Sequence, residues 1–335
     1  MAAALYGSDG FYRRPGAPAG TFRTAAHCSA IWGEAMFELA RRVDFALGCP
    51  GRFDVVDVGA GGGELLDALA HRAPARWRLC GVDVAPRPAG LPTRVAWRAD
   101  PPEQLSGLLL AVEYLDVVPV DVAEQSATGL RLVHVADGTG AERLGAKVTD
   151  RDAEWIARWW SPAAPGERAE IGWPRDDAWR SLTARLSCGV ALAVDYAAQP
   201  ARHLTGTLTG YRNGRQVPAI PDGTCDITAH VLFESLVDDD DALYSQAAAL
   251  RGLGLNREGS FTTDPASSPL DPTADPASYL HRLARAGEAA ELLDPDGLGG
   301  FTWLLHCRGV PNPIATAVRS TAVCELRCPR RRRIT

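Results

Sequence analysis

A short apolar run that meets a cluster of glycines constrains the fold of this chain more than any other feature. The run covers residues 53–58 and is rich in valine; glycines follow at 59 and 61–63, and then comes a segment with helical spacing. This order predicts a buried parallel strand, a tight turn and the start of a helix. Glycines allow positive φ angles and let a ligand lie against bare backbone, and the first N–H groups of the helix face that ligand.

A second apolar run, residues 78–84, contributes an acid to the same region. Asp83 follows Gly59 by 24 residues. At that place in an α/β sheet, a carboxylate can accept hydrogen bonds from both hydroxyls of a ribose. The turn and the acid together predict a nucleoside cofactor, and a glycine turn without a ligand is the alternative.

Details of the turn distinguish between nucleoside cofactors. A dinucleotide turn needs the pattern G-x-G-x-x-G; Gly59 and Gly61 fit its first two positions, but Glu64 stands at the third. Asp57 lies just ahead of the turn, where an acid disfavours a pyrophosphate but suits a ligand with an ammonium and a sulfonium. We therefore predict S-adenosylmethionine, not NAD, as the cofactor. The residues predicted to hold it are Asp57, Gly59, Ala60, Gly61, Gly63 and Asp83, with Asp100, after the third predicted strand, as an adenine contact.

Strand and helix patterns alternate along the first part of the chain, which predicts an α/β fold with a doubly wound parallel sheet. A helical pattern at 25–47 precedes strands near 53–58, 78–84, 94–99 and 108–112. We divide the chain into an N-terminal loop and helix (1–52), a cofactor-binding half (53–119), an inserted hairpin and helical segment (120–188), the rest of the core sheet with acceptor-site loops (189–310) and a C-terminal tail (311–335).

The later segments carry weaker patterns. Alternation at 120–124 and 130–136 predicts a hairpin, 151–188 is predicted helical, and 189–196 is predicted as a strand. Asp226 is predicted to cap a helix that runs to Leu236. A further helix (243–253), a loop (262–276) and a late edge strand (300–306) complete the expected elements.

Composition excludes several classes of protein. A net charge of −6 gives no reason to expect nucleic acid binding. The chain has no apolar run of 18 residues, so no membrane span is predicted. Its eight cysteines contain no C-x-x-C pair, so neither a zinc ribbon nor another metal site is expected. Without a signal-peptide pattern at the start, we expect a cytoplasmic protein with free thiols. The basic residues 330–333 are expected to be a solvated end.

Four separated segments carry a family resemblance. The motifs, with this chain's residues, are "GYY…GDFxTAPExSxxFGE" at Gly10-Phe11-Tyr12, 20–25 and Trp32-Gly33-Glu34; "ExGxGxG" at 57–63; "NEFxDAxPV" at 112–120; and "DYG", "YR" and "DxTAHVDF" at Asp195-Tyr196, Tyr211-Arg212 and 226–231. With these motifs the chain resembles the MidA-like family of class I methyltransferases. That family includes the mitochondrial arginine methyltransferase that helps assemble respiratory complex I. The resemblance implies a class I methyltransferase fold, S-adenosylmethionine as cofactor and a protein arginine as acceptor.

The chain departs from the family pattern at four places. His27 replaces a glutamate, Val112 an asparagine and Ala197 a glycine, and Asn213 stands where a histidine follows "YR". Cofactor residues are kept, whereas residues on the acceptor side differ. Two other functions therefore stay open: a small-molecule methyltransferase, and a non-catalytic cofactor-binding assembly protein.

Methyl transfer from a sulfonium is an in-line displacement that depends on positioning. An arginine acceptor also needs carboxylates to orient its guanidinium and a base for its proton. Such groups come from the carboxyl ends of the strands, and there we predict Glu113, Asp116 and Asp195, with His230 as a further base. Glu113 and Asp116 could instead be an exposed acid pair, Asp195 a turn cap, and His230 a core residue. A protein acceptor is the expected partner; the oligomeric state is open, with a homodimer as one option.

Overall fold

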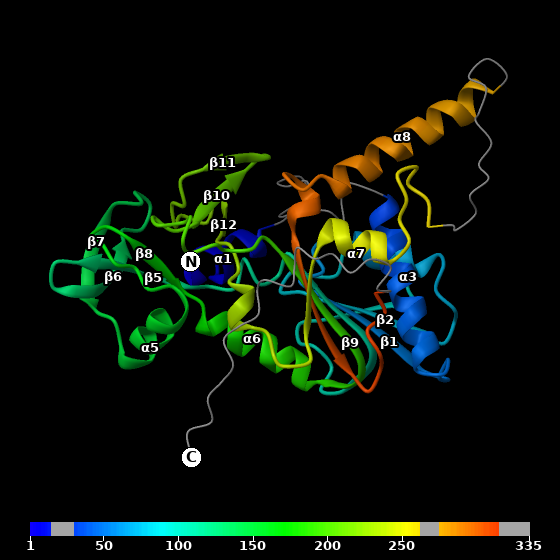
Figure 1. The fold of residues 1–335 in the computed structure, drawn as a ribbon, viewed down its shortest axis with the longest axis horizontal. Helices are drawn as coiled ribbons and strands as arrows, with labels where there is room; N and C mark the ends of the chain where they lie inside the picture. Colours follow the sequence, from blue (N-terminus) through cyan, green and yellow to red (C-terminus); the bar gives the residue numbers. More distant parts are fainter. Residues whose placement is uncertain (15–29, 262–274, 315–335) are drawn as a thin grey trace.

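A seven-stranded sheet forms the centre of the molecule (Figure 1), in the order β13-β14-β9-β4-β1-β2-β3. The computed structural model describes residues 1–14, 30–261 and 275–314. Strands β1 to β4 and β9 are parallel, and β14 runs antiparallel to β9. The strands are β1 (Phe53–Val58), β2 (Trp77–Val82), β3 (Val95–Arg98), β4 (Leu105–Val112), β9 (Leu186–Asp195), β13 (Ala242–Ser245) and β14 (Thr302–Arg308). The prediction of a doubly wound α/β sheet is confirmed.

Helices cover both faces of this sheet, because successive residues of its central strands point to opposite sides. Val55 packs into one apolar cluster and its neighbour Val56 into another. The first cluster includes side chains of α3 (Ala30–Ala46), α4 (Glu64–Ala70) and α7 (Gln246–Gly252), and the second those of α6 (Trp173–Ala184). Helix α8 (Pro276–Leu293) projects from the first side, and it is buried only near its end.

An inserted four-stranded sheet lies beside the central one (Figure 1), in the order β7-β6-β5-β8. Its elements are β5 (Asp121–Ser126), β6 (Gly129–Val135), β7 (Glu142–Lys147), α5 (Asp150–Trp159) and β8 (Arg168–Ile171). The predicted hairpin is confirmed as β5 and β6. The prediction of helix throughout 151–188 is wrong, since β8 interrupts it and β9 begins at Leu186. Residues 168–171 pair with β5, a long-range partner that four residues of local sequence do not reveal.

A small three-stranded sheet carries the N-terminal segment. It consists of β10 (Thr209–Arg212), β11 (Arg215–Val217) and β12 (Asp226–Thr228), and α1 (Ala2–Tyr6) and the 3-10 turn η1 (Phe11–Arg13) pack against it. The helix predicted from Asp226 to Leu236 is wrong. Residues 226–228 pair with β10, and only one 3-10 turn, η2 (Phe233–Ser235), follows. Ile227 and Val231 are buried in different clusters, so tertiary pairing overrides a helix-like spacing.

Three smaller expectations also differ from the structure. The helix predicted from residue 243 begins at Gln246, because residues 242–245 form β13. That strand covers the outer side of β14, so β14 is not an edge strand. A loop is predicted at 262–276, but its last residue, Pro276, is the first residue of helix α8. Residues 262–274 of that loop lie outside the described residues. The basic segment 330–333 also lies outside them. The division into five segments stays a prediction. Within the described ranges no helix is long and apolar enough to cross a membrane.

Candidate active site

The parallel strands bring most of the predicted site residues to one edge of the central sheet. Val58 at the end of β1 is in register with Val82 at the end of β2, and Val112 at the end of β4 with Val194 near the end of β9. Each strand is followed at once by a turn that carries polar groups. The site is therefore built from chain segments that lie far apart in the sequence, as is usual at the carboxyl edge of an open α/β sheet.

The glycine turn has the backbone geometry that its sequence predicts. Gly59, Gly61 and Gly63 have φ angles of 74°, 54° and 77°, values that favour glycine over residues with a side chain. The N–H groups of Gly59 and Ala60 donate to the carbonyl of Val82 at 2.9 and 3.2 Å. The turn is thus tied to β2, and α4 begins directly after it.

Asp83 fixes this turn from the neighbouring strand. Its Oδ2 accepts a hydrogen bond from the Gly61 N–H, and its Oδ1 accepts one from the Ala85 N–H, both at 2.8 Å. Each carboxylate oxygen can accept a second hydrogen bond, so the ribose contact predicted for Asp83 is compatible with this geometry. Burial raises the pKa of Asp83 above its ordinary value, while these backbone donors lower it.

Asp57 is buried at the end of β1, ahead of the turn. Burial, together with the nearby carboxylates of Asp83 and Glu64, raises the pKa of Asp57 to about 7. A desolvated acid among other acids is stabilised by a cationic partner. This environment is consistent with the predicted role of Asp57 beside the positive charges of a sulfonium ligand.

Two further residues complete the picture of the cofactor side. Sequence reasoning missed the ring of Tyr114: a Cβ atom added to Gly59 would lie 3.2 Å from its Cδ2 atom. The position of Tyr114 within the 112–120 motif is the only sequence signal for it.

Asp100 lies two residues beyond β3. Its side chain is exposed, in an open hollow that it shares with Arg98 and Glu103. Among the described residues, no hydrogen bond or ion pair joins Asp100 to the glycine turn, so its adenine contact stays a prediction.

The turn after β4 carries the predicted acceptor-site acids. Glu113 adopts a positive φ of 51°, and its N–H donates to the Val194 carbonyl at 2.8 Å. A non-glycine residue in that conformation is strained, a feature that is common at functional sites. Asp195, fully buried at the end of β9, accepts a 3.0 Å hydrogen bond from the Leu115 N–H. Asp195 therefore stabilises the turn after β4, and not a turn that follows Asp195 in the chain, so its predicted role in the acceptor site stays a prediction.

Asp116 and Asp195 form a buried carboxyl pair within hydrogen-bonding reach of each other. Burial raises the pKa of Asp116 to about 6, although Arg175 opposes this. Burial and the charges of Asp116 and Glu113 raise the pKa of Asp195 well above its ordinary value. Two carboxyl groups this close share a proton more readily than they both ionise. The pair can thus hold one proton between its two carboxyl groups.

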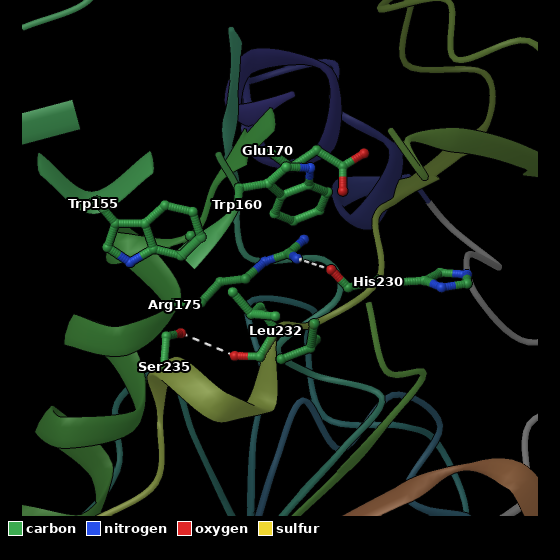
Figure 2. A pocket seen from close by; sticks show the side chains of 9 residues that line it. Trp155, Trp160, Glu170, Arg175, His230, Leu232 and Ser235 are labelled. Carbon is green, nitrogen blue, oxygen red and sulfur yellow. Dashed lines mark hydrogen bonds between the residues drawn. The ribbon is translucent and has the colours of Figure 1, made fainter. Parts of the chain in front are cut away.

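Arg175, the second buried group that sequence reasoning missed, connects this turn with the segment after β12. Its guanidinium donates to the carbonyls of Asp116 and His230, each at 2.7 Å, and to that of Val118 at 3.3 Å. It lines a cavity of about 10 Å³, which is far too small for a nucleoside. Figure 2 shows the guanidinium directed at the His230 carbonyl, with the imidazole of His230 pointing away. Nothing in the helical pattern around Arg175 distinguishes it from a surface arginine.

The imidazole of His230 lies among aromatic rings. It stacks on Tyr196 with a centroid distance of 5.6 Å and meets His203 edge-on at 5.1 Å. Burial and the neighbouring His203 lower the pKa of His230, which favours the neutral ring. Its Nδ1 is buried and has no hydrogen-bond partner among the described residues. The predicted role of His230 as a base stays a prediction.

The structure joins two of the sequence motifs that lie far apart in the chain. The hydroxyl of Tyr12 donates to Asp226 Oδ2 at 2.7 Å, across 214 residues of sequence. Tyr6, which stacks on Tyr12 with a centroid distance of 5.5 Å, donates to the Val117 carbonyl at 3.1 Å. The N-terminal segment thus borders the turn that holds Asp116. His27 lies outside the described residues.

Comparisons with known proteins agree with this geometry. A family model described as S-adenosyl-L-methionine-dependent methyltransferase (Methyltransf_28) matches residues 42–248. The chain belongs to this methyltransferase family. A COG1565 superfamily protein from Burkholderia thailandensis, crystallised with S-adenosyl-homocysteine, is 25% identical, with a TM-score of 0.74 over 96% of this chain and 90% of that one. A native structure of a COG1565 superfamily protein from the same organism is 26% identical, with a TM-score of 0.73 and the same coverage. A search of curated proteins gives no match.

The predicted resemblance to the MidA-like methyltransferases, the class I fold and the cofactor are thereby confirmed. The residues of this methyltransferase fit S-adenosylmethionine on physical grounds. The glycine turn offers backbone that a side chain would cover, Asp83 keeps acceptor capacity, and Asp57 favours a cation. The described ranges hold no cluster of three or more His, Cys, Asp or Glu suited to a metal ion. Which residues contact the cofactor remains a prediction.

Proposed function

We propose that this S-adenosylmethionine-dependent methyltransferase modifies a protein, at the guanidinium of an arginine. The observation that carries the proposal is a group of three buried carboxyls, from the turn after β4, the end of β9 and the start of β12. Each has one side-chain oxygen that is buried and has no hydrogen-bond partner within the described ranges; they are Asp116, Asp195 and Asp226.

A guanidinium matches such a group because it carries five N–H donors in a fixed plane and stays charged at every relevant pH. The buried arginine nearby, Arg175, directs its N–H groups to backbone carbonyls instead of carboxylates. The acids therefore remain available for an external cation. The ring of Tyr196 lies close enough to Asp116 and Asp195 to feel their charges, and a guanidinium packs well against such an aromatic face.

S-adenosylmethionine, when bound, supplies an electrophilic methyl group on its sulfonium. The residues of the chain hold the acceptor nitrogen in line with that methyl group and take its proton. Glu113, the less buried acid on the strained turn, orients the guanidinium. Asp116 and Asp195 lie deeper and accept the proton at a carboxylate oxygen as the nitrogen–carbon bond forms. The sulfur keeps the electron pair of the bond that breaks.

A small-molecule acceptor is the second candidate. The departures at Val112, Ala197 and Asn213 favour it, because they fall in the motifs of the acceptor side. A small cationic amine or guanidine would use the same carboxyl groups. The non-catalytic alternative is set aside, because the family is one of methyltransferases.

Mass spectrometry of proteins that co-purify with a catalytically weakened Glu113→Gln variant tests the proposal. Cells with and without the gene are compared for methylated peptides. We expect a co-purifying protein whose arginine is methylated only when the wild-type gene is present. Methylation confined to a small metabolite, with no gene-dependent change on any protein, would overturn the protein assignment.

A further inference from the structure

Asp226 has a place in the structure that its predicted role as a helix cap does not explain. It starts β12, its side chain is buried, and its Oδ1 has no hydrogen-bond partner in the described part of the chain. Its other oxygen accepts the Tyr12 hydroxyl at 2.7 Å. A buried acceptor without a donor is destabilising, because it has lost its hydrogen bonds to water. An acid in this state has the capacity to bind one more donor.

Asp226 is both buried and close to another acidic side chain. Burial, together with the negative charge of Asp116, raises the pKa of Asp226 to about 7, and the hydrogen bond from Tyr12 opposes this rise. Within the described ranges no arginine or lysine forms an ion pair with Asp226. The charge of Arg175 acts on Asp116, but its N–H groups donate to backbone carbonyls. Coulombic attraction is several times stronger in such a setting than in water. A cation with N–H donors is the ligand that this arrangement stabilises most.

We propose that Asp226 binds the cationic group of the methyl acceptor through Oδ1, and that Tyr12 is a positioning residue that holds its other oxygen. The inference rests on the proposed function for the class of acceptor, a guanidinium. It adds a binding carboxylate outside the turn after β4, and it gives the N-terminal segment a part in the acceptor site. Because Oδ1 is buried in the structure, an acceptor reaches it only if neighbouring side chains other than that of Tyr12 move aside.

The pH dependence of acceptor binding follows from this arrangement. Asp226 must be ionised to attract a guanidinium, so affinity rises with pH through the pKa of Asp226. The Tyr12 hydrogen bond stabilises the ionised form, so its loss moves that rise to higher pH. The titratable groups around Asp226 are Tyr12 of η1, Tyr6 of α1, Asp116 after β4, the neighbouring Cys225 and Tyr211, its cross-strand partner on β10. Of these groups, Asp116, with a pKa of about 6, has the pKa closest to that of Asp226.

The test measures peptide binding without turnover. The full chain, saturated with S-adenosylhomocysteine, is titrated calorimetrically with acetyl-Gly-Arg-Gly-amide and with the same peptide carrying citrulline, a neutral isostere of arginine, from pH 6 to pH 9. The wild-type protein is expected to prefer arginine, with a preference that rises through about pH 7 and levels off above about pH 8. Asp226→Asn keeps the shape and the Tyr12 contact, and it should weaken arginine binding by roughly tenfold or more. Cofactor affinity serves as the folding control.

Tyr12→Phe and Tyr6→Phe form a matched pair, since each removes one hydroxyl and only the first removes a donor to Asp226. Tyr12→Phe should move the rise in arginine affinity to higher pH, and Tyr6→Phe should leave it in place. Unchanged arginine binding by Asp226→Asn, or equal affinity of the wild-type protein for the two peptides, would overturn the inference. Arginine binding that depends on Asp226, without any methyl transfer to the peptide, would support the inference and count against the proposed function.

Discussion

The backbone N–H of Gly61 donates a 2.8 Å hydrogen bond to Oδ2 of Asp83, the acid expected to hold the ribose of the cofactor. One carboxylate thus stabilises the glycine turn and retains acceptor capacity for a ligand. The turn and the acid come from different strands, so their contact depends on the pairing of β1 with β2. Changes at either residue are expected to affect cofactor binding, although for different reasons.

Asp83→Ala should weaken the binding of S-adenosylmethionine and S-adenosylhomocysteine by about 1.5–3 kcal/mol, the range for hydrogen bonds to a charged group. The variant also loses the hydrogen bond that supports Gly61, so the melting temperature of the unliganded protein should fall. Isothermal calorimetry measures the first effect, and a thermal melt the second. Unchanged cofactor affinity would show that the ribose is held elsewhere.

Gly61→Val should abolish cofactor binding. Gly61 has a φ of 54°, and a β-branched residue adopts that angle only with strain. Its side chain would also cover backbone that the ligand is expected to approach. A thermal-shift assay with S-adenosylmethionine, and with NAD as the control ligand, measures the loss. Normal binding by this variant would mean that the turn is structural only.

Glu113→Gln should separate the acceptor side from the cofactor side. Cofactor affinity should stay within a few fold of wild type, since the acid is assigned to the acceptor. Methyl transfer should drop by roughly 100-fold or more, the scale for loss of a charged positioning group or base. Should cofactor binding fall as far as in Asp83→Ala, the division of the site is wrong. Full activity would mean that another residue supplies the acceptor-site carboxylate, with Asp116 and Asp195 as the next candidates.

The binding of S-adenosylmethionine should depend on pH through Asp57. Burial raises the pKa of Asp57 to about 7, and its ionised form favours the cationic ligand, so affinity should rise about tenfold from pH 6 to pH 8. The folding stability of the protein without ligand depends on pH with the opposite sign. The native state keeps a proton on Asp57 that the unfolded state has released, so stability falls as pH rises from about 4 through 7.

Asp57→Asn provides the comparison. The variant should lose the pH dependence of ligand affinity, and its unliganded form should be more stable than wild type above pH 7, by about 1–3 kcal/mol. Chemical denaturation and calorimetry across this pH range measure both quantities. An unchanged pH profile in the variant would assign the titration to another group.

Arg175→Met should lower the free energy of unfolding by about 3–5 kcal/mol, as for the removal of one partner from a buried polar network. The substitution leaves the carbonyls of Asp116 and His230 without their donor. Arg180, an exposed arginine on the same helix, offers the control, and Arg180→Met should change stability by about 0.5 kcal/mol or less. Denaturant unfolding measures the free energy of unfolding of both variants. Equal losses in the two variants would contradict the structural role assigned to Arg175.

The sequence is enough to predict the parallel strands of the central sheet, because they are continuous apolar runs separated by turn residues; β13, most of which lies within a segment predicted as helix, was missed. The glycine turn and the placement of Asp83 and Glu113 follow from strand order alone. The strand at 226–228 and the strand β8 could not be predicted in this way. Their partners, β10 and β5, are distant in sequence, and short strands carry little pattern of their own.

The contacts of Arg175 and Tyr12 escaped prediction for the same reason. Both residues act through hydrogen bonds to segments far along the chain, and composition does not mark them. The motif that contains Tyr12 and the one that begins at Asp226 are both visible in the sequence. Only the folded chain shows that they meet.

The most direct measurement of the central claim uses purified enzyme and S-adenosylmethionine with an isotopically labelled methyl group. Wild-type protein and the Gly61→Val variant are incubated with an extract from cells that lack the gene, and the labelled products are hydrolysed and identified by mass spectrometry. The account predicts label on arginine, released as methylarginine, with wild-type protein and none with the variant. Label on another amino acid or only on small molecules, or no transfer at all, would contradict it.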